Sequence, residues 1–108
     1  MGKWATYRKR GSQNALPALP PPPQPTLTED EPDLVSSPET DLNVGGQFVL
    51  EMEDGPGNWT LVANQPFAYP LVNWGPTASF AEGSYRAYQI GNGQNFAGYS
   101  IPSDAYLI

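Results

Sequence analysis

The chain has 108 residues, with five Lys and Arg against eleven Asp and Glu, and it contains no His and no Cys. It therefore lacks an imidazole base, a thiol nucleophile, disulfides and the usual zinc ligands. No stretch longer than eight residues is free of both Gly and Pro, whereas an average helix has about 11–12 residues. These counts exclude an α-helical fold and most familiar enzyme mechanisms, so we expect a non-enzymatic protein without cofactor or metal.

The chain shows no signal for membrane insertion or export. Its apolar runs are a few residues long, far short of the roughly 18 that a spanning helix needs. No apolar stretch follows the basic N-terminus, as it would in a signal peptide. We therefore expect neither a transmembrane segment nor a signal peptide.

The first 43 residues are polar and rich in proline. Four of the five basic residues lie in the first ten positions, and six of the eleven acids lie between Glu29 and Asp41. Between these charged blocks, residues 16–25 contain six prolines, which favour an extended polyproline II rod. We expect residues 1–43 to form an extended arm without a core of its own, in which the acidic block 29–33 is a solvated linker.

Residues 44–108 have a different composition. Thirty of these 65 residues are apolar or aromatic, and they include 11 of the 13 aromatic residues. Such a length can form one small domain of marginal stability. Residues 44–108 are therefore predicted to be a small β domain.

The clearest predicted element of this domain is a hairpin over residues 47–64. Residues 48–53 alternate apolar and acidic side chains, as a half-buried strand does. Residues 54–58 are a dense turn signal, and residues 59–64 form the return strand. The side chains predicted to face inward are Phe48, Leu50 and Met52 on the first strand and Trp59, Leu61 and Ala63 on the second.

The rest of the domain also has the pattern of strands and turns. The prolines of residues 65–76 fit edge strands or loops. Residues 84–90 are predicted to be a strand, followed by a turn over 91–95. A further strand over 98–103 and an apolar tail over 105–108 complete the chain.

Residues 47–108 resemble part of a fibronectin type III or related immunoglobulin-like sandwich. The likeness is carried by residues 57–62, by the Gly-x-Tyr at 83–85 and by the Gly-x-Ser-x-Pro-Ser at 98–103. The resemblance implies that Tyr85 is a tyrosine corner with a buried ring and a hydroxyl bonded to nearby backbone. The early strands of that family are missing from the pattern, so we expect an antiparallel sandwich of about five strands, or one that a neighbouring chain completes. The predicted structural core is Phe48, Leu50, Trp59, Leu61, Tyr85 and Ala87.

The arm carries the candidate partner-binding residues. Its basic end mixes cations with two aromatics, which suits an acidic protein surface, a weak contact with nucleic acid, or a solvated tail. Its proline run suits either a stiff spacer or a ligand of a polyproline-recognition domain. The candidates are Lys3, Trp4, Tyr7, Arg8, Lys9, Arg10, Leu16, Leu19, Pro20, Pro21, Pro22 and Pro23.

Two other groups of residues have alternative interpretations. The carboxylates Glu51, Glu53 and Asp54 favour a solubilising face over the paired acids of a glycosidase. Four aromatics are candidates for core packing or, if several face outward together, for a platform that stacks on sugars. These aromatics are Trp59, Trp74, Tyr88 and Tyr99.

The leading functional hypothesis is a structural protein of a large assembly, in particular a minor capsid, cement or decoration protein of a virus or phage. Its arm would tie neighbouring subunits together, and its partners would be the shell protein and further copies within the virion. The alternative is a soluble, cytoplasmic adaptor that binds a polyproline-recognition domain through residues 19–23. A glycan-binding β module is a third hypothesis.

Overall fold

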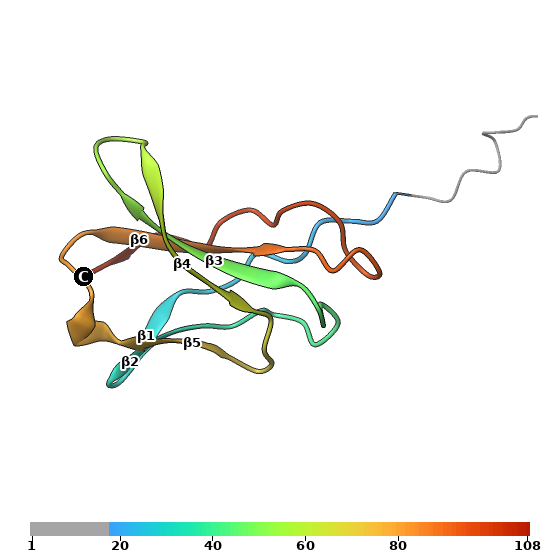
Figure 1. Ribbon diagram of the computed structural model, residues 1–108, viewed down its shortest axis with the longest axis horizontal. Helices are drawn as coiled ribbons and strands as arrows, with labels where there is room; N and C mark the ends of the chain where they lie inside the picture. The colour runs from blue at the N-terminus through green and yellow to red at the C-terminus, as the bar shows by residue number, and fades with distance from the viewer. Residues whose placement is uncertain (1–17) are drawn as a thin grey trace, which may run out of the picture.

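The computed structural model describes residues 18–108, which form two antiparallel β-sheets (Figure 1). The three-stranded sheet has the order β1-β2-β5, and the four-stranded sheet has the order β4-β3-β6-β7. The elements are β1 (Thr28–Asp30), β2 (Asp33–Ser36), β3 (Gln47–Glu53), β4 (Trp59–Pro66), β5 (Val72–Pro76), the 3₁₀ turn η1 (Thr77–Ser79), β6 (Ser84–Ile90) and β7 (Tyr106–Leu107). Within residues 18–108, no helix has the length and apolar character needed to cross a membrane. The predicted antiparallel all-β sandwich is confirmed, with seven strands instead of about five.

Both sheets contribute to one hydrophobic core. Leu34 of β2 and Trp74 of β5 meet side chains of β3 and β6, and the rings of Phe48 and Trp74 pack edge to face with centroids 6.4 Å apart. This geometry is favoured between aromatic rings. Four of the six predicted core residues are confirmed as buried: Phe48, Leu50, Tyr85 and Ala87.

The predicted hairpin is present as β3 and β4, but its register shifts between Leu50 and Glu51. Leu50 pairs with Ala63, whereas Glu51 pairs with Leu61. The extra residue in β4 is a β-bulge, which turns the preceding side chains of the strand to the opposite face. Leu61 is therefore exposed and Trp59 is only half-buried on the outer surface, so the prediction that these two residues belong to the core is wrong.

Tyr85 has the environment that the tyrosine-corner prediction requires. Its side chain is fully buried, and its hydroxyl donates a 2.6 Å hydrogen bond to the carbonyl of Ala81, four residues earlier. Phe80 packs edge to face against its ring at 5.7 Å. The contacts join β6 to the segment that follows η1, so this tyrosine fixes the connection between the two sheets.

The predicted boundary at Val44 does not separate an arm from a domain within the described residues. Residues 18–43 provide β1 and β2, and Leu27 and Leu34 belong to the common core. The acidic block 29–33, expected to be a linker, forms the antiparallel β1–β2 hairpin. Its strands are short and carry acids on their exposed side, which hides them from a search for apolar alternation. This chain thus supplies two strands of its own ahead of residue 44.

The segment predicted as a strand over 98–103 lies beside β6 but bonds to it in another way. Tyr99 makes a single bridge with Ile90. Beyond it, the hydroxyl oxygens of Ser100 and Ser103 accept hydrogen bonds from backbone N–H groups of β6, at 2.8 and 2.9 Å. These side chains replace part of the backbone ladder, so the segment follows β6 without forming a strand.

Candidate binding surfaces

The strands run between two ends of the sandwich, and different loops and turns connect the strands at each end. At one end lie the loops 37–46, 67–71 and 91–98, which we call the loop end. At the other lie the turns 31–32, 54–58 and 77–83, which we call the acidic end. Figure 1 shows the loop end on the right, where the described chain also begins, and the acidic end on the left.

Two asparagines and one glutamine hold the loop end together. Buried Asn43 donates from Nδ2 to Gln89 Oε1 and to the Ile90 carbonyl, both at 3.2 Å. Its Oδ1 accepts a 2.9 Å hydrogen bond from the Asn92 N–H. Asn92 Nδ2 in turn donates to the carbonyls of Leu42 and Val44, both at 3.0 Å. Loops 37–46 and 91–98 are therefore fixed to one another by side-chain amides.

Close packing at Gly46 supports the same network. A Cβ built on this residue would lie 2.5 Å from Asn43 Nδ2 and 2.6 Å from the Ile90 carbonyl oxygen. The Gly46 carbonyl also accepts a 2.9 Å hydrogen bond from the Phe67 N–H. This position requires glycine because two backbones and a buried amide converge on it. The third loop is thereby joined to the other two.

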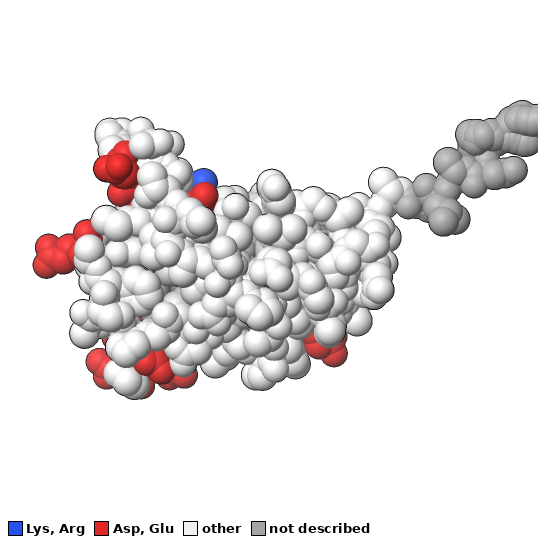
Figure 2. Space-filling model, viewed as in Figure 1, with Lys and Arg blue, Asp and Glu red and all other residues white. Residues whose placement is uncertain are grey.

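Large apolar side chains are exposed on these fixed loops. Val44 is 69% exposed and Leu42 is 54% exposed, while Tyr69 and Leu71 are exposed on loop 67–71. Figure 2 shows acids gathered over the acidic end, and one acidic patch towards the loop end. Exposed apolar groups on a rigid frame are typical of a binding surface.

The proline-rich segment bonds to the sandwich from Pro20 onward, although residues 18–21 are exposed. The Pro20 carbonyl accepts a 3.0 Å hydrogen bond from the Ala97 N–H, and the Pro23 carbonyl accepts one of 3.0 Å from Gln89 Nε2. Pro22 is buried, Pro23 is half-buried, and Leu19 is partly exposed. Of the predicted arm residues, Lys3, Trp4, Tyr7, Arg8, Lys9, Arg10 and Leu16 lie outside the described residues.

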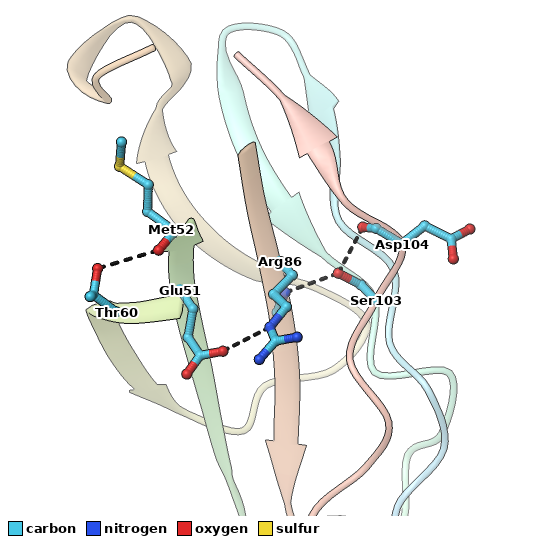
Figure 3. Close-up of polar contacts among 7 residues, drawn as sticks. Glu51, Met52, Thr60, Arg86, Ser103 and Asp104 are labelled. Carbon is cyan, nitrogen blue, oxygen red and sulfur yellow. Dashed lines mark hydrogen bonds and ion pairs between the residues drawn. The ribbon is translucent and has the colours of Figure 1, made fainter. Parts of the chain in front are cut away.

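The outer face of the four-stranded sheet, turned away from the core, forms a second surface. Arg86 Nε lies 2.8 Å from Glu51 Oε1 (Figure 3). The Arg86 guanidinium also lies 4.3 Å from the centroid of the Trp59 ring. The rings of Tyr88 and Tyr99 pack together with centroids 5.7 Å apart. A hollow of about 250 Å³ lies among these groups, lined by Glu51, Arg86, Tyr88, Tyr99, Ser100 and Pro102.

The charged groups around this hollow change the pKa of Tyr88. Burial raises the pKa of its hydroxyl, and the charge of Glu51 and the neighbouring Tyr99 raise the pKa further. Arg86 acts in the opposite direction. The hollow therefore places the neutral Tyr88 phenol beside an ion pair, which is suited to binding polar ligands by stacking and hydrogen bonding.

The carboxylates considered for glycosidase chemistry do not face one another as a free pair. Glu51 is paired with Arg86, and Glu53 Oε2 accepts a 2.8 Å hydrogen bond from the Gly57 N–H in the hairpin turn. Across residues 18–108, no group of three or more acidic, His or Cys side chains could hold a metal ion. The described carboxylates thus have structural partners or face solvent.

No protein-family model matches the chain, and no match was found among the curated proteins. The likeness of residues 47–108 to fibronectin type III domains therefore rests on the residues named above.

Sequence reasoning did not identify the residues that organise the loop end. Asn43 and Asn92 are of a residue type that is common in turns, and Gln89 resembles an exposed polar residue of a strand. One signal in the sequence could have indicated the network. Gln89 is a polar residue that alternates in phase with Tyr85 and Ala87, which places it on the buried face of β6. A buried amide at a core position requires hydrogen-bond partners, which here come from loops distant in sequence.

Proposed function

We propose that the protein is a non-enzymatic structural component of a large assembly, in particular of a viral or phage particle, and that it docks there through its loop end. The observation that carries this proposal is the set of exposed apolar side chains on loops fixed by Asn43 and Asn92. Loops that are already ordered lose little conformational entropy on binding. The surface is thus prepared for a protein partner before contact.

The distribution of charge supports a second contact with the same partner. Residues 1–10 hold four of the five basic residues, and every acid lies after residue 28. The described residues begin at the loop end, where Pro20 lies beside Ala97. The basic residues would meet an acidic region of the shell or the packaged nucleic acid while the apolar loops bind the protein, since such charges steer and orient association.

The contacts of the proline run weigh against the adaptor hypothesis. A polyproline-recognition domain needs an accessible rod of prolines. In this chain Pro22 is buried, and the carbonyls of Pro20 and Pro23 are bonded within the sandwich. Leu19, Pro20 and Pro21 are exposed, but a domain that binds the whole run would require Pro22 and these carbonyls to leave their present contacts.

The test compares two exposed apolar residues in cells that make the protein from its own gene. Tagged wild-type chain and the variants Val44→Asp and Ile101→Asp are followed by size fractionation of the lysate. We expect wild type and Ile101→Asp to migrate with a particle, and Val44→Asp to lose at least ten-fold in association, which is about 1.4 kcal/mol. A wild-type chain that migrates alone, or equal behaviour of the two variants, would overturn the proposal.

A second candidate function is glycan binding by the outer face, because three of the four candidate aromatics lie on it. Trp59, Tyr88 and Tyr99 surround the Glu51–Arg86 pair. The fourth, Trp74, is buried, and its Nε1 donates to Ser36 Oγ at 2.9 Å. Aromatic rings beside hydrogen-bonding side chains suit the two faces of a sugar.

The glycan hypothesis is tested by NMR titration with a panel of neutral oligosaccharides. Tyr99→Ala removes an outer-face ring that is 67% exposed, and Tyr69→Ala removes a loop-end ring that is 61% exposed. Binding that is lost only in Tyr99→Ala supports a glycan module. Absence of binding to every sugar in the panel leaves assembly as the proposed function.

A further inference from the structure

Within residues 18–108, the strand β4 has one edge without a partner. It stands at the end of the four-stranded sheet and, in this part of the chain, pairs only with β3. It is eight residues long, the longest strand among the described residues. Alternate backbone N–H and C=O groups of such a strand point away from the sheet and can template another strand.

The other three sheet edges carry features that discourage pairing. The edge strand β1 has three residues, two of them the acids Glu29 and Asp30. The strand β7 has two residues, and β5 contains Gly75 and ends at Pro76. Short length, charge, proline and β-bulges are the usual protections of an edge. β4 has no charged residue, and its one proline, Pro66, is its last residue, so the bulge near Val62 is its one feature of this kind.

The side chains along β4 are also exposed. Leu61 is 64% exposed and Val62 is 39% exposed. Apolar side chains on facing strands stabilise a sheet by cross-strand contact. The combination of unpaired backbone and exposed apolar side chains lies along one strand, whose last residue, Pro66, leads into loop 67–71.

We propose that two copies of this chain pair through β4, antiparallel and about a two-fold axis near Val62. An antiparallel edge is complementary to itself, so one strand supplies both sides of a closed interface. The pairing would join two four-stranded sheets into one of eight strands. The β-bulges of the two copies would lie side by side at the axis, leaving the strand regular on either side.

The positions of the acidic residues favour pairing of two copies in the antiparallel direction. The acids next to β4, Glu53 and Asp54, lie at the hairpin turn, which projects from the body of the sandwich in Figure 1. In a parallel pair these acids of both copies would meet and repel. In the antiparallel pair each hairpin turn meets the uncharged Gln65 and Pro66 end, because eight residues span about 27 Å at about 3.4 Å each.

The first experiment is sedimentation equilibrium of the full chain over a range of concentrations. Leu61→Lys places a charge on β4, and Ile101→Lys is its control because Leu61 and Ile101 are both 64% exposed. We expect a concentration-dependent dimer in wild type and Ile101→Lys, and a dissociation constant raised about ten-fold or more in Leu61→Lys by like charges at the axis. A wild type that stays monomeric at its highest soluble concentration overturns the proposal.

A second measurement locates the interface independently of that substitution. The chain has no cysteine, so Val62→Cys introduces a single thiol. Directly opposite residues of an antiparallel pair have Cα atoms about 4.5–5.5 Å apart, within the range that a disulfide bridges. Mild oxidation should give a covalent dimer with Val62→Cys and little with Ile101→Cys. A dimer that cross-links equally well through Ile101→Cys would place the contact elsewhere.

Discussion

The two ends of the sandwich are joined by the same strands, yet they are stabilised in different ways. At the acidic end, the turns carry charged side chains into solvent, and their side-chain hydrogen bonds are local, as between Gly57 and Glu53. At the loop end, longer loops are connected by buried amides that span more than forty positions, as between Asn43 and Gln89. Turns with local side-chain bonds and loops fixed by distant amides thus lie at opposite ends. Substitutions at matched positions of the two ends can test this division.

The largest difference is expected between two glycines. Gly46→Ala places a Cβ against Asn43 and the Ile90 carbonyl, and overpacking together with a strained amide network should cost about 3 kcal/mol. Gly55 at the acidic end has φ +85° and nothing within 4 Å of an added Cβ. Gly55→Ala should therefore cost only about 1 kcal/mol of backbone strain. Urea denaturation of both variants measures the difference, and equal costs would contradict it.

Two asparagines provide the next comparison. Asn43→Ala leaves Gln89 Oε1 and the Asn92 N–H without their partner, which should lower the free energy of unfolding by about 2 kcal/mol. Amide hydrogen exchange should also accelerate across residues 91–98. Asn58 at the acidic end donates one exposed hydrogen bond to the Asp54 carbonyl, so Asn58→Ala should cost at most about 0.5 kcal/mol. Unchanged exchange in the first variant would show that the amides do not hold the loops.

The acidic end has one buried anchor, the hydroxyl of Tyr85. Tyr85→Phe removes its hydrogen bond to the Ala81 carbonyl while keeping the ring. The expected loss is about 1 kcal/mol in the free energy of unfolding, with unchanged exchange at the loop end. Thermal denaturation followed by near-ultraviolet circular dichroism checks the stability. A loss confined to the loop end would contradict the separation of the two ends.

The smallest effect concerns alkaline pH. Burial raises the pKa of Tyr85 above its ordinary value of 10.0, so the unfolded chain releases this proton before the folded chain does. The associated stability is complete below pH 10 and is lost as pH rises from there through the folded pKa. Stability of the wild type should fall more steeply above pH 10 than that of Tyr85→Phe. Parallel curves in urea titrations at several pH values would exclude this contribution.

The parts of the fold that sequence could predict are those governed by local pattern. The β3–β4 hairpin, β6 and the burial of Phe48, Leu50, Tyr85 and Ala87 follow from alternation and turn residues. The positions of Trp59 and Leu61 do not, because one inserted residue reverses the face and leaves the composition unchanged. β1 and β2 escape prediction because strands of three and four residues show too little periodicity.

The candidate surfaces are less predictable than the fold. The aromatic side chains of the outer face are candidates from sequence, but the orientation of Trp59 depends on the bulge. The loop end was not recognised, since its apolar residues are scattered over three loops and its amides act across the sandwich. Such surfaces arise from residues that are distant in sequence, whereas the signals used for prediction are local.

The packing of residues 18–27 has a consequence for how the protein is made. Pro20 bonds to Ala97, and Gln24 Nε2 donates to the Pro102 carbonyl at 2.9 Å. The first described segment therefore finds its partners only after nearly all later strands have been synthesised. Pairings this distant along the chain slow folding and lengthen the time during which edges such as β4 are open to other chains. The fold cannot be completed until residues near 102 have left the ribosome. The nascent chain is therefore a candidate for chaperone protection during synthesis.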